Sequence, residues 1–316
     1  MLIDKLDTKK NLLAFSGGVD STSLFFILLE HNIPFDIAIV NYNQRTQSTQ
    51  EVEHALKLAK QYKKICFVKE YDKEKFSEKL ARDFRYQFFD EIIENKNYET
   101  LITAHQLNDK IEWFIMQLAK GAGVVELLGL EEYSKRKKYQ IFRPLLEYTK
   151  EELLVFLKEK KIKYFIDETN KDPKYQRNYI RKKYANEFVN EYKEGIRKSF
   201  LYLHNDVDSI NRLYSVKKLE QMSVATFINE DDNIKLRFID KELKQRGVLV
   251  TKETKDEILR QKEIVVSHTI AIAINNNKVY ITPYCEFSMD KKFKEWCRLH
   301  IIPKNVRAYL STLSID

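Results

Sequence analysis

The sequence predicts an α/β protein in which a doubly wound parallel sheet is followed by a helical linker and a small α+β domain. Through residues 1–187, short apolar segments alternate with longer segments of helical spacing, which is typical of a parallel sheet covered on both faces. The alternation stops beyond about Glu187, so residues 188–219 are assigned to the linker and 220–316 to the second domain. A chain of 316 residues is long enough for two domains with their own cores.

The strands and helices of the first domain follow from apolar spacing. The predicted strands are 12–15, 36–40, 65–68 and 101–104. The predicted helices are 20–28, 51–62, 76–92 and 111–118. Thr149 begins a further helix, because a threonine followed by acidic residues is an N-terminal capping pattern. Parallel sheets bind ligands at the carboxyl ends of their strands, where three segments are expected: Ser16–Ser21, Asn41–Arg45 and His105–Glu112.

The second domain has less regular spacing. Residues 190–219 predict one or two helices that lead away from the sheet. Strands are predicted at 225–228, 236–239, 269–274 and 278–282, with a helix at 252–261. Asn275–Asn277 separates the last two strands and is suited to a hairpin turn. The sequence of this domain has no recognisable pattern of catalytic residues.

The turn after the first strand carries the strongest functional signal. It reads Ser16-Gly17-Gly18-Val19-Asp20-Ser21, in a chain with only 7 glycines. Glycine lets backbone N–H groups approach a phosphate, and a helix N-terminus adds partial positive charge. The turn is therefore a predicted phosphate cradle, although it is neither a Walker A loop nor a Rossmann fingerprint. The alternative is a plain strand end at which Asp20 or Ser21 caps the helix.

Two further segments have side chains suited to chemistry or to nucleic acid. Asp109 and Glu112 share one helical face and could hold a metal or orient a nucleophile, or could simply complement the helix dipole. Between Lys171 and Tyr184, six basic residues and one acid are interleaved with tyrosines. This composition fits phosphate contacts and base stacking, and fits a solvated helix face equally well.

The amino-acid composition limits which partners and which cellular compartment are expected. The net charge of +8 permits binding to a polyanion without requiring it. The three cysteines include no CxxC pair, which suits a reducing cytoplasm and offers no zinc site. No apolar segment approaches the roughly 20 residues of a membrane span, and no signal-peptide pattern is present. The expected location is therefore cytoplasmic.

The glycine turn resembles the PP-loop of ATP pyrophosphatases, which cleave ATP between the α and β phosphates and adenylate a substrate. Further motifs occur in the order and approximate spacing of one family, the tRNA(Ile)-lysidine synthases. These motifs are 81–86, 103–105 with Asp109 and Glu112, 121–123, 143–146, and the most specific one, 167–181. The resemblance is strong over residues 12–181 and loose beyond them.

The resemblance implies a PP-loop (adenine nucleotide α-hydrolase-like) fold and an enzyme that uses ATP and Mg²⁺. It would adenylate the C2 oxygen of the wobble cytidine of tRNA(Ile) with a CAU anticodon, and free lysine would then displace AMP to give lysidine. The implied partners are this tRNA and free lysine, with no membrane; a homodimer and a tRNA-gripping second domain are further expectations.

Residue roles are also implied by the resemblance. The ATP-binding residues would be Ser16, Gly17, Gly18, Val19, Asp20 and Ser21. Asp20, Arg85 and Glu112 are the expected catalytic residues, with Asp20 beside Mg²⁺. His105, Asp109 and Glu112 would form the lysine pocket. Arg177, Asn178 and Arg181 would contact the tRNA.

The chain departs from the family pattern at four positions. Tyr42 stands where the family usually has histidine, Asn108 where it has aspartate, Lys110 where it has glutamine, and Glu168 where it has proline. The alternatives to lysidine formation are a PP-loop tRNA thiolase, a small-molecule synthetase, and a nucleotide- and RNA-binding module without chemistry. A lone cysteine in the first domain, Cys66, disfavours the thiolase.

Overall fold

The computed structural model describes residues 6, 8–43, 46–72, 76–136, 138–166 and 176–313. Within it the chain forms two compact units, Met1–His204 and Asn205–Asp316. Two sequence motifs fall partly outside the described residues. These are Arg45 in the 41–45 segment and the 167–175 part of the most specific family motif.

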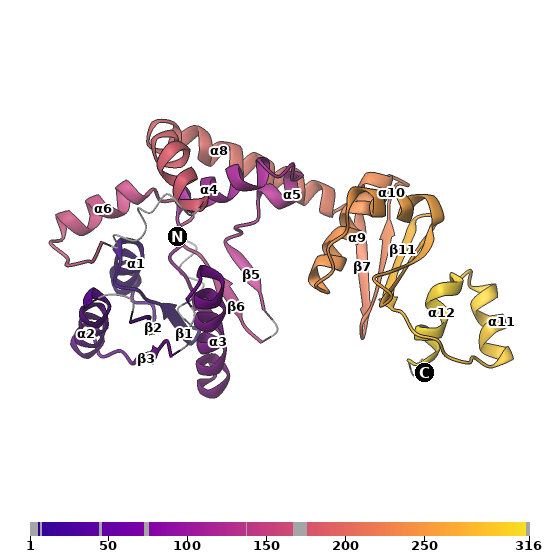
Figure 1. Cartoon of the computed structure of the whole chain (residues 1–316), viewed down its shortest axis with the longest axis horizontal. Helices are drawn as coiled ribbons and strands as arrows, with labels where there is room; N and C mark the ends of the chain where they lie inside the picture. Colours follow the sequence, from indigo (N-terminus) through magenta and orange to yellow (C-terminus); the bar gives the residue numbers. More distant parts are fainter. Residues whose placement is uncertain are drawn as a thin grey trace. The chain divides into compact units, whose positions relative to one another are not determined.

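The first unit is built on a six-stranded sheet with the order β3-β2-β1-β4-β6-β5 (Figure 1). The strands are β1 Asn11–Ala14, β2 Phe35–Asn41, β3 Cys66–Glu70, β4 Thr100–Ile102, β5 Tyr133–Lys135 and β6 Gln140–Phe142. Every neighbouring pair is parallel except β5 and β6. The predicted parallel sheet is therefore confirmed, with one short antiparallel strand added at its edge.

Helices cover both faces of this sheet. The helices from α1 to α8 are α1 Val19–Glu30, α2 Thr46–Gln61, α3 Glu78–Lys96, α4 Leu107–Leu118, α5 Val124–Leu127, α6 Lys150–Glu159, α7 Gln176–Ile180, a π-helical turn η3 Arg181–Ala185, and α8 Asn186–Asn211. Leu13 of β1 packs in a core cluster with residues of α1, α2 and α6. The next-door residue Leu12 packs in a second cluster with α3. Because successive strand residues point to opposite faces, β1 is buried on both sides.

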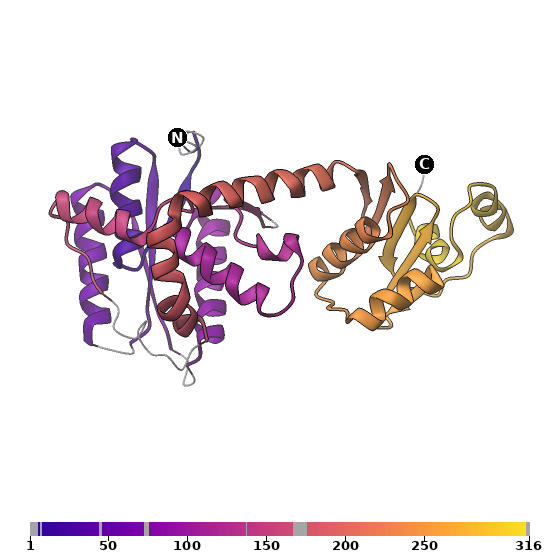
Figure 2. The same ribbon diagram turned by 90° about the horizontal axis from the view of Figure 1, so that it is seen from above.

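Local sequence explains how several helices begin. Thr149 caps α6: its hydroxyl accepts from Glu152 N at 3.1 Å, and the Glu152 carboxylate accepts from Thr149 N at 2.8 Å. Ser77 caps α3 in a similar way, accepting from Leu80 N at 3.2 Å. Phe76 therefore precedes α3 instead of opening it, which corrects the expected helix start. Figure 2 shows the length of α8, which bends where Tyr192 leaves helical geometry.

The second unit is an antiparallel sheet with the order β7-β8-β11-β10-β9. Its strands are β7 Tyr214–Leu219, β8 Met222–Phe227, β9 Glu263–Val266, β10 Ile270–Asn275 and β11 Lys278–Pro283. Its helices are α9 Asp232–Gln245, α10 Lys252–Gln261, α11 Lys291–Leu299 and α12 Lys304–Ser311. The predicted β10–β11 hairpin is confirmed, and Asn276 adopts the left-handed φ of 49° that its turn needs.

Two expectations for this unit are wrong. Residues 236–239 lie in α9 and not in a strand, because Asp231 caps a helix there and Phe238, Ile239 and Leu243 are buried at helical spacing. Residues 214–219 are the edge strand β7 and not part of a helical linker, because they pair along the whole of β8. Across both units, none of the described helices is long and apolar enough to cross a membrane.

Candidate active site

The glycine turn joins β1 to α1 in a conformation that depends on glycine. Gly17 has φ +73°, and its carbonyl accepts a hydrogen bond from Phe165 N at 2.9 Å. A Cβ on Gly17 would lie 3.4 Å from the Phe165 ring. The residue that caps α1 is Gly18, which has no side chain to cover the first free N–H groups. Neither Asp20 nor Ser21 caps the helix, so those groups are left for a ligand.

Two serines fix the shape of the turn. The hydroxyls of Ser16 and Ser21 lie 3.0 Å apart, and Ser21 Oγ also accepts from Ser16 N at 3.2 Å. The Ser21 hydroxyl is additionally within 3.3 Å of the Gly18 carbonyl. These contacts close the loop on itself, so its backbone is held in place before a ligand binds.

Asp20 lies in the first turn of α1 with one carboxylate oxygen, Oδ1, buried and without a hydrogen-bond partner among the described residues. Burial, assisted by the charge of Asp109, raises the pKa of Asp20 to about 7, and Lys150 and Arg181 act in the opposite direction. A buried carboxylate without a partner is costly unless something binds it. Asp20 is thus suited to contact a cation.

A crevice of about 800 Å³ opens beside this turn at the carboxyl ends of β1, β2 and β4. Its wall includes these predicted site residues: Ser16, Gly18, Val19, Asp20, Ser21, Arg85, His105, Asn178 and Arg181. Tyr42 also lines it. The structure therefore brings most of the candidate residues together, from segments that are up to 165 residues apart in the chain (Ser16 to Arg181).

The crevice also contains cationic residues that the sequence reasoning missed. Arg82 of α3 and Lys150 of α6 lie on its wall beside the predicted Arg85 and Arg181. Lys150 is the first residue of α6, directly after the capping residue Thr149. The capping pattern therefore predicted where this lysine starts a helix, but nothing local indicated that the helix begins at the crevice. With Lys182, which also lines the crevice, five cationic side chains lie around the phosphate-binding turn and suit a polyphosphate ligand.

Asp109 and Glu112 of α4 lie in a buried ion cluster with two arginines. Arg177 donates from Nε to Glu112 Oε2 at 2.8 Å and from Nη2 to Asp109 Oδ1 at 2.6 Å. Arg181 donates to Glu112 from Nη2 at 2.9 Å and makes a second, shorter contact from Nε. Glu112 is 0% exposed. Both carboxylates are thus already paired, and Arg177 and Arg181 face the inside of the unit.

Charges within this cluster set its protonation. Burial acts to raise the pKa of Asp109, but Arg177, Arg181 and the Gln106 N–H outweigh it and hold the pKa below its usual value. Burial lowers the pKa of His105 to about 4, and its Nδ1 lies 3.0 Å from the Thr103 hydroxyl. At neutral pH Asp109 and the two arginines are therefore ionised, and the His105 imidazole is neutral.

Three of the four departures from the family pattern lie among the described residues, and each has a partner of its own; Glu168 lies outside them. Asn108 accepts from Lys150 N at 3.1 Å and donates to Asn186 Oδ1 at 3.0 Å, which joins α4 to α6 and α8. Lys110 is buried, 3.2 Å from Glu147 and 4.4 Å from the centre of the Phe200 ring. The Tyr42 hydroxyl donates to Ala81 O at 3.4 Å. These three residues contribute to packing around the crevice.

The fit of a metal ion rests on Asp20. Among the described residues, no group of three or more histidines, cysteines and acids could hold a metal ion. Mg²⁺ does not need such a group, because it is usually held by one or two carboxylates together with substrate phosphates and water. The unpartnered Asp20 Oδ1 beside the phosphate-binding turn fits that mode of binding.

Comparisons with known proteins agree with this geometry. A family model described as "PP-loop domain" matches residues 1–188. The tRNA(Ile)-lysidine synthase of Campylobacter jejuni (strain RM1221) is 41% identical over 310 residues, covering 97% of this chain and 94% of that protein. The tRNA(Ile)-lysidine synthase of Helicobacter pylori (strain ATCC 700392 / 26695) is 41% identical, with coverage of 98% and 91%.

A solved structure shares the fold. The U34-tRNA thiolase NcsA from Methanococcus maripaludis, with its [4Fe-4S] cluster, matches 63% of this chain and 73% of its own, with a TM-score of 0.52. At 17% sequence identity this likeness concerns the fold alone.

Proposed function

The chain belongs to the tRNA(Ile)-lysidine synthase family of ATP-dependent ligases, and we propose that its crevice is where lysidine is formed on tRNA(Ile). ATP adenylates the C2 oxygen of the wobble cytidine and pyrophosphate leaves. The side-chain amine of free lysine then attacks C2 and AMP leaves. The observation that carries the proposal is one crevice that combines an uncapped glycine turn, an unpartnered Asp20 oxygen and five cationic side chains.

The glycine turn binds the phosphates of ATP. The N–H groups at the start of α1 have no side chain over them, and the Ser16–Ser21 contacts hold them in place. Preorganised donors of this kind stabilise charge without having to reorganise during the reaction. When bound beside Asp20, Mg²⁺ would offset the charge of the phosphates and of the leaving pyrophosphate.

Arg85 stabilises the charge that develops on the α-phosphate, and it does so from α3 on the crevice wall. Lys150 and Arg181, on the same wall, balance the remaining phosphate charge. The three cations come from different elements, so the crevice can surround a polyphosphate instead of contacting it on one side.

His105, Asp109 and Glu112 form the lysine side of the site. His105 is neutral at pH 7 and can accept a hydrogen bond from an ammonium group, whereas both carboxylates are held by Arg177 and Arg181. For a carboxylate to orient the lysine amine, one arginine must release it. We assign to Arg181 this exchange, because it lines the crevice and also pairs with Glu112.

The tRNA contacts are assigned to two regions. Asn178 and Arg181 face the crevice, where the anticodon loop must present the cytidine. The second domain grips the tRNA body and so holds that base over the crevice. A chain that ends at His204 is expected to bind ATP and to lose most lysidine formation. Full activity of that shortened chain would overturn the assignment to the second domain.

The reaction is tested by incubating the protein with total tRNA, ATP and labelled lysine, followed by nucleoside analysis. The expected products are lysidine in tRNA(Ile), AMP and pyrophosphate. ADP and phosphate as products, or label in no nucleoside, would contradict the proposal. The same digest would reveal a thiolated base, although the sequence has only three cysteines and Cys66 is the one in the first unit.

A further inference from the structure

The segment formed by α7 and η3 has two differently occupied faces. Arg177 and Arg181 lie on the inner face, where they pair with Asp109 and Glu112. Tyr179, Lys183 and Tyr184 lie on the outer face, and both tyrosines are exposed. The basic and aromatic residues that the sequence presents as one group are therefore divided, with the arginines used inside the unit and the tyrosines left for a partner.

The outer residues form an ordered cluster, which we name the Tyr179–Lys183–Tyr184 platform. Lys183 Nζ donates to the Tyr179 hydroxyl at 2.6 Å and lies 5.1 Å and 5.3 Å from the centres of the Tyr179 and Tyr184 rings. The two rings meet edge to face with centres 6.1 Å apart. Exposed fractions of 43% for Tyr179 and 45% for Tyr184 leave ring surface available to a ligand.

A groove of about 930 Å³ continues from this platform between α4 and α8. Lys183 and Tyr184 belong to its wall, followed along α8 by Phe188 and Tyr192, whose ring centres are 5.3 Å apart. The opposite wall is apolar and comes from α4. The neighbouring residues Arg181 and Lys182 line the nucleotide crevice instead. The π-helical turn is thus a wall shared by the crevice and the groove.

We propose that the platform and the groove behind it bind an unstacked nucleobase of the tRNA anticodon loop, next to the cytidine in the crevice; this inference rests on the proposed function. Single-stranded RNA is recognised by stacking its bases on aromatic rings, with cations near the backbone. Lys183 provides that positive charge between the two exposed rings. Glu187 and Glu191 on the groove wall disfavour a phosphate there, so the groove suits the base and Lys183 suits the backbone.

The location favours a base of the same loop over any other occupant. A base that enters the groove and the cytidine that enters the crevice would straddle one helical turn, η3, which spans five residues. When a neighbouring base is bound on the other side of this wall, the cytidine is held in position although the platform does not touch it. Less conformational entropy of the anticodon loop is then lost on reaching the transition state. The platform residues therefore act in positioning and not in the chemistry.

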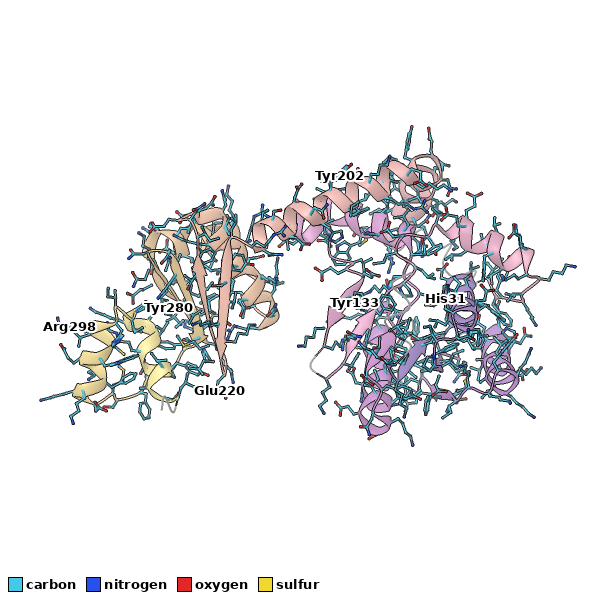
Figure 3. The ribbon with its side chains drawn as sticks, turned by 180° about the vertical axis from the view of Figure 1, so that it is seen from behind. His31, Tyr133, Tyr202, Glu220, Tyr280 and Arg298 are labelled. Carbon is cyan, nitrogen blue, oxygen red and sulfur yellow. The ribbon has the colours of Figure 1, made fainter. Side chains whose placement is uncertain are left out.

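The test compares variants of the full chain in tRNA binding and in the kinetics of lysidine formation. Tyr184→Ala is expected to weaken tRNA(Ile) binding and to raise KM for tRNA about 10-fold, because stacking on one ring typically contributes that much. The kcat value and the affinity for ATP should change little. Tyr184→Phe should retain the wild-type values because it keeps the ring. The matched control is Tyr202→Ala on α8, another exposed tyrosine of the first unit (Figure 3).

A set of tRNAs lacking one base at each anticodon-loop position except the wobble position identifies the stacked base. With wild-type protein, one such tRNA should bind about 10-fold more weakly. With Tyr184→Ala the same tRNA should show no further loss of affinity, because removing the second partner of a contact that is already lost has no additional effect. The inference would be overturned if Tyr184→Ala and Tyr202→Ala bound tRNA equally well. It would also be overturned if the loss of affinity from Tyr184→Ala and that from each missing base were independent at every position.

Two outcomes separate this inference from its premise. If wild-type protein binds tRNA but forms no lysidine, the proposed function fails, while the binding comparison still decides whether the platform holds a base. If Tyr184→Ala instead changes the molecular mass in solution and leaves tRNA binding intact, the groove is an interface between copies of the chain, and the inference is wrong.

Discussion

Two aspartates near the crevice, Asp20 on its wall and Asp109 behind it in the ion cluster, differ in what surrounds them. Asp20 has an oxygen without a partner among the described residues, and its pKa is raised to about 7. Asp109 is the more deeply buried of the two, yet arginines hold its pKa below the usual value. Burial acts in the same direction on both carboxyl groups, so the difference comes from their partners. A buried acid without a partner indicates a position where a ligand is expected to bind, whereas a buried acid paired with arginine already has its charge compensated by the protein.

The largest effect on activity is expected from replacing Asp20. Asp20→Asn is expected to lower the rate of lysidine formation about 10³-fold, as is typical when a group that stabilises developing charge is lost. Folding should be unaffected or slightly more stable, because the substitution removes an unpaired buried charge. Steady-state rates and urea unfolding measure the two effects.

The control for Asp20 is an aspartate with full hydrogen bonding. Asp36 accepts from Ile65 N and from the Tyr98 hydroxyl, both at 2.6 Å. Asp36→Asn should therefore lower stability while leaving the rate at saturating substrate unchanged. If Asp20→Asn lost stability and activity in parallel, as a structural residue does, the comparison between the two acids would collapse.

In the cluster where the carboxylates are paired with arginines, a substitution should mainly lower the free energy of unfolding. Glu112→Gln leaves Arg177 and Arg181 partly uncompensated in a buried position, and breaking a buried ion pair costs about 3 kcal/mol. Adding Arg177→Gln to this variant should cost less than the sum of the two single changes, because the residues share one network. Urea unfolding of the wild type, the two single variants and the double variant gives a double-mutant cycle. If the two single effects simply add up to the double effect, the cluster does not act as a unit.

A third acid, Glu152 of α6, tests a paired carboxylate that is only partly buried. Burial would raise the pKa of Glu152, but Thr149 N–H, Lys193 and Arg197 outweigh it and lower the pKa to about 2. The stabilisation is therefore complete above the usual value of 4.5 and is lost as the pH falls toward 2. Because solvent screens the group, Glu152→Gln should cost about 1 kcal/mol at pH 7.

The comparison with wild type at pH 3 sharpens this prediction. The difference in unfolding free energy between Glu152→Gln and wild type should shrink from pH 5 to pH 3. A difference that stays constant over this range would mean that the contacts act through geometry and not through charge.

The smallest effect is expected at Asn108. Asn108→Asp keeps the acceptor for Lys150 N but removes the donor to Asn186, which is worth about 1 kcal/mol. Asn108→Asp should therefore unfold at slightly lower urea concentration while ATP binding persists. An unchanged midpoint would show that the Asn108–Asn186 contact does not stabilise the junction of α4 and α8.

Much of the first unit could be predicted because its signals are local. The apolar segment before Ser16 and the glycine pair specify a strand, a turn and a helix within about a dozen residues, and the structure confirms each. The spacing of Arg177 and Arg181 likewise predicted a shared face. What that face contacts could not be predicted, because Glu112 lies 65 residues away from Arg177.

The errors have equally physical reasons. Residues 236–239 form a short apolar segment, which periodicity alone cannot assign to a strand or a helix. Strand β7 is mostly exposed and contains two lysines, so it lacks the apolar alternation of a half-buried strand. Lys150 was overlooked because a lysine at a helix start has no local feature that distinguishes a ligand-facing side chain from a solvated one.

The π-helical turn η3 also has a consequence for how insertions and deletions would act. Each helical residue advances by about 100°, so a turn that accommodates an extra residue shifts the angular phase of everything after it. Asn186, Lys193 and Arg197 meet Asn108 and Glu152 only in this phase. Deleting one residue from Arg181–Ala185 would straighten the helix and rotate these three side chains away together. The turn thus sets the angular position of α8 so that Asn186 contacts α4 while Lys193 and Arg197 contact α6.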